Sequence, residues 1–124
     1  MFRYKKKRRF FIKTFIEEYE GASEQLAKSR YKNAAILFSK ALFALCDLII
    51  YLRLAKLPKN HSERFRVLAD YFPDIYSIVD DIFKHYTDAY SKPVLKETCE
   101  KIKNGIKSLV RNNPVPEAVK KAAE

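Results

Sequence analysis

Glycine is nearly absent from this chain of 124 residues, which contains two, and its five prolines leave long stretches uninterrupted. An all-β fold needs glycine and proline at its many turns, so this scarcity argues against one. The length fits one domain that can bury a core without disulfide bonds. With 48% hydrophobic and 32% charged residues, the composition is that of a globular chain rather than a disordered one. The predicted fold class is therefore all-α.

Cysteine is equally scarce. Cys46 and Cys99 are too few for a secreted disulfide framework and too far apart for a metal-binding knuckle, and their apolar helical positions predict buried thiols. The longest apolar run, ALFALCDLIIYL, is shorter than a membrane span and contains Asp47. The basic N-terminus is not followed by the apolar segment of a signal peptide. We therefore expect a cytoplasmic protein with no membrane segment and no cofactor.

Positive charge is concentrated at the N-terminus. Residues 1–13 carry seven basic side chains and no acidic one, whereas the rest of the chain carries 18 basic and 15 acidic ones, out of a net charge of +10. Basic side chains interleaved with aromatic ones bind the phosphates and bases of nucleic acids, although an acidic partner or anionic lipid attracts the same charges. The alternative is a frayed terminus that only aids solubility. If the segment binds nucleic acid, the candidate residues are Arg3, Lys5, Lys6, Lys7, Arg8 and Arg9.

Hydrophobic periodicity predicts five helices, at about residues 10–27, 31–56, 61–71, 73–90 and 93–111. The second is apolar around most of its circumference, which predicts a central position. Asn60 and Glu63 have the spacing of a capping box before the third helix, and Pro73 suits the first turn of the fourth. Because short connections favour antiparallel neighbours, we predict an up-and-down bundle of four long helices plus one short helix. The bundle would span residues 10–111, between a basic segment at 1–9 and a tail at 112–124.

Four segments of the chain resemble the HEPN domain (higher eukaryotes and prokaryotes nucleotide-binding domain). They are SKALFAL in the central helix, NHSERFRVLADYF after the proline turn, YFPDI at the next junction, and DAYSKP before the last helix. The resemblance covers about residues 10–111. It implies a bundle of four to five helices that often forms homodimers. It also implies, as for many stand-alone prokaryotic members, a minimal nucleotidyltransferase as partner in a toxin–antitoxin or nucleotide-handling system.

Other HEPN proteins are ribonucleases, in which an arginine is followed after four to six residues by a histidine. The two side chains meet their copies across the dimer at the end of the penultimate long helix. This chain has two histidines, and neither completes that motif. Eighteen residues separate Arg66 from His85, and seven separate Arg53 from His61. We therefore predict no catalytic residue of the family type.

The end of the fourth predicted helix, DDIFKHYTDAYSKP, holds the candidate nucleotide- or partner-binding residues Asp81, Lys84, His85, Asp88 and Tyr90. Asp81, His85 and Asp88 lie at helical steps of four and three and share one face. Two carboxylates and an imidazole can bind a metal or perform acid–base chemistry. A solvent-exposed polar face has the same spacing, so no metal site is predicted.

Asp47 is unexpected in the most apolar helix, because a buried carboxylate costs several kcal/mol unless it is paired. It must face a rim, a cation or a dimer interface. With Ser39, Phe43 and Tyr51 it forms one side of the helix, either a polar seam or part of a ligand cleft. His61 is interpreted as a residue that begins the third helix.

The sequence therefore predicts a non-catalytic HEPN-like domain that dimerises and binds a minimal nucleotidyltransferase, a nucleotide, or both. Two alternatives remain. One is a degenerate ribonuclease that uses Lys84, His85 and Tyr90, and the other is an RNA-binding protein that acts through its basic N-terminus.

Overall fold

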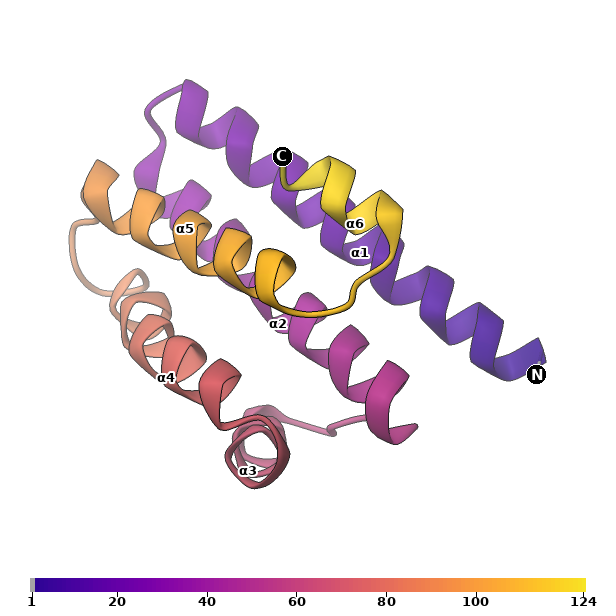
Figure 1. Cartoon of the computed structure of the whole chain (residues 1–124). Coiled ribbons are helices and arrows are strands. Elements are labelled where there is room, and N and C mark those ends of the chain that lie inside the picture. The colour runs from indigo at the N-terminus through magenta and orange to yellow at the C-terminus, as the bar shows by residue number, and fades with distance from the viewer. Residues whose placement is uncertain (1) are drawn as a thin grey trace.

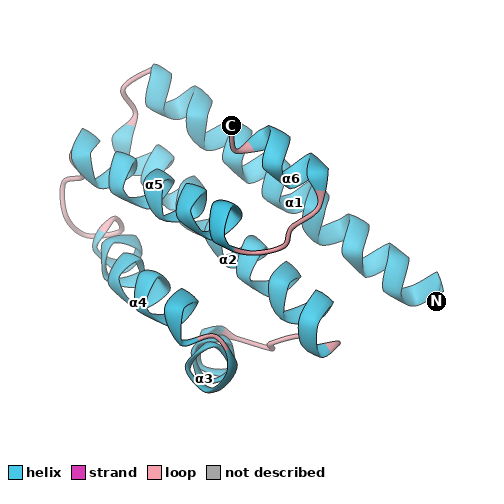
Figure 2. Ribbon diagram, in the orientation of Figure 1, coloured by secondary structure: helices cyan, strands magenta, loops and turns pink. Residues whose placement is uncertain are grey.

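The computed structural model describes residues 2–124, with side chains from residue 4 onward, and contains six helices and no strand within those residues (Figure 2). This confirms the all-α class. The helices are α1 (Phe2–Ala27), α2 (Tyr31–Leu54), α3 (His61–Tyr71), α4 (Pro73–Asp88), α5 (Lys96–Asn112) and α6 (Glu117–Ala122).

Helix α2 is the centre of the packing. It contacts α1, α3, α4 and α5, and its most extensive contact is the antiparallel pair with α1 (Figure 1). Its fully buried side chains include Phe38, Leu42, Leu45 and Leu48, which pack against Phe15 of α1 and the inner faces of α4 and α5. A helix that is apolar on several sides is stable only with neighbours on those sides, as the sequence predicted.

Helix α2 is also long and apolar enough to cross a membrane by length and composition. In the structure, 72% of its most apolar window of 18 residues is buried by the other helices. The core helix of a water-soluble protein passes the same test, so the composition of α2 is explained by its place in the core.

The basic N-terminal segment is part of α1, which begins at Phe2 rather than near residue 10. Lysine and arginine are good helix formers, so nothing in the segment interrupts the helix. The ring of Tyr4 stacks on Tyr51 at the far end of α2, with ring centroids 5.2 Å apart. The first turns of α1 lie at the edge of the molecule (Figure 1), where they present their charges beside the end of α2.

The short elements follow the local signals of the sequence. The Asn60 side chain accepts a hydrogen bond of 2.9 Å from the Glu63 N–H, as expected for the N-cap of α3. Pro73 begins α4. Helix α5 begins three residues later than predicted, at Lys96. The predicted tail contains α6, which packs on α1 and buries Val119 completely.

The two glycines have opposite surroundings, which predicts opposite effects of a methyl group. A Cβ atom at Gly21 would lie 3.5 Å from Leu37, an ordinary contact, whereas one at Gly105 would lie 2.5 Å from the Ile82 Cδ1 atom. We expect Gly21→Ala to raise the free energy of unfolding by about 1 kcal/mol through helix propensity. We expect Gly105→Ala to lower the free energy of unfolding by about 1 kcal/mol, because the cost of overpacking against Ile82 outweighs the gain in helix propensity.

Urea unfolding monitored by circular dichroism measures both effects. Ile82→Val removes the obstructing Cδ1 atom and should therefore rescue Gly105→Ala, although it destabilises the wild type. Equal stabilisation by both glycine substitutions would contradict the close approach of α4 and α5 at Gly105.

Candidate functional site

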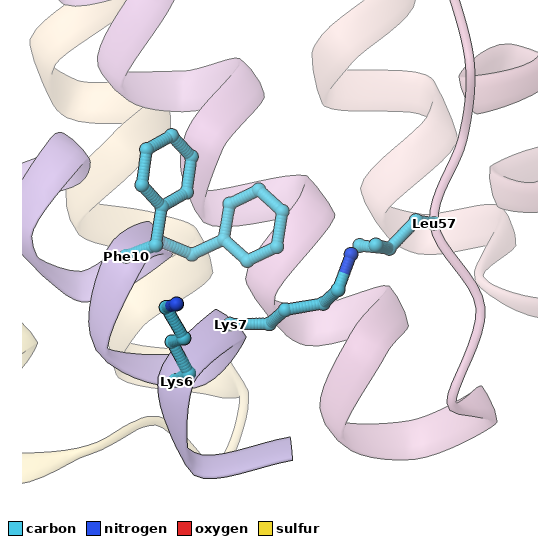
Figure 3. A pocket seen from close by; sticks show the side chains of 5 residues that line it. Lys6, Lys7, Phe10 and Leu57 are labelled. Carbon is cyan, nitrogen blue, oxygen red and sulfur yellow. The ribbon is translucent and has the colours of Figure 1, made fainter. Parts of the chain in front are cut away.

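A basic, aromatic hollow lies at the N-terminal end of α1. Its volume is ≈ 430 Å³, and it is lined by Lys6, Lys7, Phe10, Phe11 and Leu57. Figure 3 shows Lys6 and Phe10 on α1, with Lys7 extending toward Leu57 on the segment that follows α2. Phe10 is 62% exposed, so its ring is accessible to a ligand. We call this feature the basic hollow.

A second hollow adjoins the basic hollow, because Phe10 and Phe11 line both. It has a volume of ≈ 370 Å³, and α1, α2, α3 and α4 all contribute to it. Its lining residues are Phe10, Phe11, Thr14, Glu18, Lys40, Phe43, Ala44, Asp47, His61 and Tyr86. We call it the histidine cleft. Phe43 and Asp47 line it; they belong to the side of α2 for which the sequence left open a polar seam or a ligand cleft.

Asp47 is paired with a cation, Arg64 of α3. The Arg64 Nε and Nη2 atoms donate to the two carboxylate oxygens of Asp47 at 2.8 and 2.9 Å. The guanidinium also lies over the Phe43 ring, with its Cζ atom 5.2 Å from the centroid. Burial by itself would lower the pKa of Arg64, but the hydrogen bonds and charge of Asp47 outweigh that effect and raise it. The pair is bidentate and only slightly exposed, which is a strong geometry for an ion pair.

His61 is the third member of this cluster. Its Nδ1 atom lies 2.7 Å from Arg64 Nη1. Its ring packs edge-to-face against Phe43 and Phe83, with centroids 4.9 and 5.0 Å away, and lies 6.0 Å from the Tyr86 ring. Burial and the Arg64 cation lower the pKa of His61, while Asp47 opposes them. The imidazole is therefore neutral at physiological pH.

The pairing with Arg64 limits the chemistry of His61. A guanidinium has donors and no acceptor, so Nδ1 must accept the hydrogen bond, and a neutral ring then carries its proton on Nε2. No lone pair of the ring is left to remove a proton from a substrate hydroxyl. The cluster is suited to binding by hydrogen bonds rather than to general base catalysis.

The state of His61 predicts a pH dependence of stability. Because the pKa of His61 is lower in the folded chain than its ordinary value of about 6.5, the unfolded chain binds a proton more readily below that pH. Stability contributed by the neutral ring is therefore present above about pH 6.5 and is lost as pH falls toward the lowered pKa. We expect urea unfolding at pH 7.5 and 5.5 to show a smaller difference for His61→Gln than for the wild type.

His85→Gln provides the matched control for this measurement, because it removes the other histidine of the chain. If the wild type and His61→Gln lose the same stability between pH 7.5 and 5.5, His61 has the same pKa in the folded and the unfolded chain.

The predicted residues of α4 are dispersed instead of forming one site. Asp81 forms an exposed ion pair with Lys101 of α5 at 3.0 Å, and the hydrogen bond to this lysine holds the pKa of Asp81 below its usual value. The Asp88 Oδ1 atom lies 3.5 Å from the Nζ atom of Lys92, in the segment that follows α4. His85 and Asp88 line a separate hollow of ≈ 160 Å³, and Asp81 lines yet another beside Lys101.

Lys84 is exposed, and its carbonyl oxygen accepts a bond from the Thr87 hydroxyl. Tyr90 is 55% exposed, and its hydroxyl donates to the Tyr86 hydroxyl at 3.3 Å. This bond, together with burial, raises the pKa of Tyr86 to about 12. Tyr90 thus approaches the histidine cleft through Tyr86. Among the residues that the structure describes, no three histidine, cysteine or acidic side chains gather as a metal site would require.

Arg64 and His61 are the site residues that the sequence interpretation missed. A signal for them existed: a cation can stabilise a carboxylate in an apolar helix, and His61 and Arg64 are three residues apart on one helical face. The ribonuclease motif of the family has an arginine before a histidine, whereas here His61 precedes Arg64. Lys6 and Lys7 line the basic hollow, and their binding of nucleic acid stays a prediction.

Comparison with known proteins adds no family assignment: no protein-family model, no curated protein and no solved structure matches the chain. The resemblance to HEPN domains therefore stays a prediction that depends on the sequence segments quoted above.

Proposed function

We propose that the chain is a non-catalytic HEPN-like helical domain that binds a nucleotide, free or as part of an RNA strand, across the two adjoining hollows. The observation that supports this most is the exposed Phe10 ring, which lines both hollows between the lysines of α1 and the His61 cluster. Aromatic faces stack on bases and lysines neutralise phosphates. In the basic hollow, Phe10 provides the aromatic face and Lys6 and Lys7 provide the positive charges.

The absence of catalysis is supported by the hydrogen-bonding state of His61. Its Nδ1 atom accepts from Arg64, so the ring lacks the free lone pair that a ribonuclease base needs. The degenerate ribonuclease of the sequence interpretation would instead use Lys84, His85 and Tyr90. Tyr90 is hydrogen-bonded to Tyr86, whereas His85 lines a different hollow beside Asp88.

Titration of the protein with adenosine 5′-monophosphate and with an eight-nucleotide oligoadenylate, by calorimetry and fluorescence anisotropy, tests this function. Binding of the mononucleotide indicates a free nucleotide as ligand, and binding of the oligomer alone indicates RNA. We expect Phe10→Ala to weaken binding about tenfold through loss of stacking. His85→Ala is the matched control outside the hollows. Equal binding by both variants, or no binding by the wild type, would reject the proposed site.

The proposed partners rest on the resemblance to HEPN domains alone. We propose a cytoplasmic homodimer that associates with a minimal nucleotidyltransferase. Gel filtration of the chain alone and after co-expression with such an enzyme tests this. An unchanged monomer peak in both cases would reject the partners without bearing on nucleotide binding.

A further inference from the structure

The Nε2–H group of His61 is free for a ligand. Within the described residues the ring's one hydrogen bond is made through Nδ1, to Arg64. In the same part of the chain, the one buried side-chain nitrogen or oxygen without a partner is the Tyr19 hydroxyl. His61 Nε2 is therefore within reach of solvent, in a side chain that lines the histidine cleft.

The charges along the two hollows differ. The lining of the histidine cleft carries two acidic side chains, Glu18 and Asp47, and one basic side chain, Lys40, and Arg64 neutralises Asp47. The basic hollow has Lys6 and Lys7 and no acidic side chain in its lining. An anionic group is therefore attracted to the basic hollow, whereas the histidine cleft presents aromatic surface and a neutral donor.

From these observations we infer that the histidine cleft binds the uncharged edge of a nucleobase through the Nε2–H of His61, while the phosphate lies in the basic hollow. Arg64 is a positioning residue: by donating to Nδ1 it keeps the ring neutral and its proton on Nε2. The inference depends on the proposed nucleotide binding and adds to it the ligand's orientation and the group that reads the base.

Comparison of two probes, adenosine 5′-monophosphate and ribose 5-phosphate, tests the assignment of the base. Both carry the phosphate, and only the first carries a base. We expect His61→Phe to weaken binding of the nucleotide about tenfold, the effect of one neutral hydrogen bond, and to leave ribose 5-phosphate unchanged. His61→Gln retains an N–H donor and should restore part of the lost affinity.

The protonation state of His61 provides a second readout, independent of affinity. Long-range ¹H–¹⁵N spectra should show His61 as the Nε2–H tautomer in the wild type, and the Nε2 resonance should shift when the nucleotide binds. The double variant Asp47→Leu/Arg64→Met removes the donor to Nδ1 without leaving a buried charge. In that variant we expect a mixture of tautomers and weaker nucleotide binding.

The outcomes separate the two proposals. Nucleotide binding that His61→Phe leaves unchanged, or an Nδ1–H tautomer in the wild type, overturns this inference and leaves the proposed function standing. If His61→Phe weakens the binding of both probes equally, the inference is also overturned, because His61 would then contact the phosphate that the two probes share. No binding of either probe to the wild type overturns this inference, and it overturns the proposed function as well if the eight-nucleotide oligoadenylate does not bind either.

Discussion

Arg64→Met should lower the free energy of unfolding by about 3 kcal/mol, the low end of the range for breaking a buried ion pair. The substitution keeps most of the side-chain volume over Phe43 but removes three hydrogen-bond donors, two to Asp47 and one to His61. Asp47 is then left as a carboxylate of low exposure without a cation, in the C-terminal half of the core helix. Urea unfolding at pH 7.5 measures the loss.

Two variants show whether the cost comes from the unpaired charge. In Asp47→Leu/Arg64→Met both partners become apolar, and we expect stability within about 1 kcal/mol of the wild type. Lys101→Met removes the cation of the exposed pair with Asp81 and should cost less than about 1 kcal/mol. A similar small cost for Arg64→Met and Lys101→Met would show that the Asp47–Arg64 pair does not stabilise the fold.

The double charge reversal Lys6→Glu/Lys7→Glu should weaken oligoadenylate binding by about 2 kcal/mol, or about 30-fold, at low salt. Each lysine in contact with a single strand contributes about 0.7 to the slope of log affinity against log salt. Losing two contacts therefore makes the slope shallower by about 1.4. Anisotropy titrations at several salt concentrations measure both quantities.

Lys120→Glu/Lys121→Glu is the matched control for this charge reversal. It changes the net charge equally, and both lysines lie on α6, outside the lining of the two hollows. If the two double variants lose the same affinity, the attraction comes from the overall charge of the protein. If neither changes the slope, the basic hollow is not a phosphate site.

The fold was largely predictable because its signals are local or periodic. The apolar periodicity located α2, and the cap at Asn60 and the proline at residue 73 marked the beginnings of α3 and α4. The beginning of α1 was less predictable. Helix propensity permits a helix through the basic segment, but the stacking of Tyr4 on Tyr51, a contact between distant residues, is not visible in a local pattern.

The site was less predictable than the fold because it is assembled from four helices. Helical spacing places Asp81, His85 and Asp88 on one face of α4. They do not form one site, because Asp81 pairs with Lys101 and Asp88 pairs with Lys92. Conversely, Asp47 and Arg64 are separated by 17 positions and meet only once α3 has packed beside α2. The sequence indicated that Asp47 faces a rim, a cation or a dimer interface, and it did not indicate Arg64 as the partner.

The bond between Asp47 and Arg64 also closes a loop of the chain, since it joins the C-terminal half of α2 to the first turn of α3 across the whole α2–α3 connection. Helix α3 has few other contacts with α2. Loss of this bond should therefore loosen α3 from α2, and we expect the amide protons of α3 to exchange faster in Arg64→Met than in the wild type. Occupancy of the neighbouring cleft would then slow exchange throughout α3, including amides that no ligand touches.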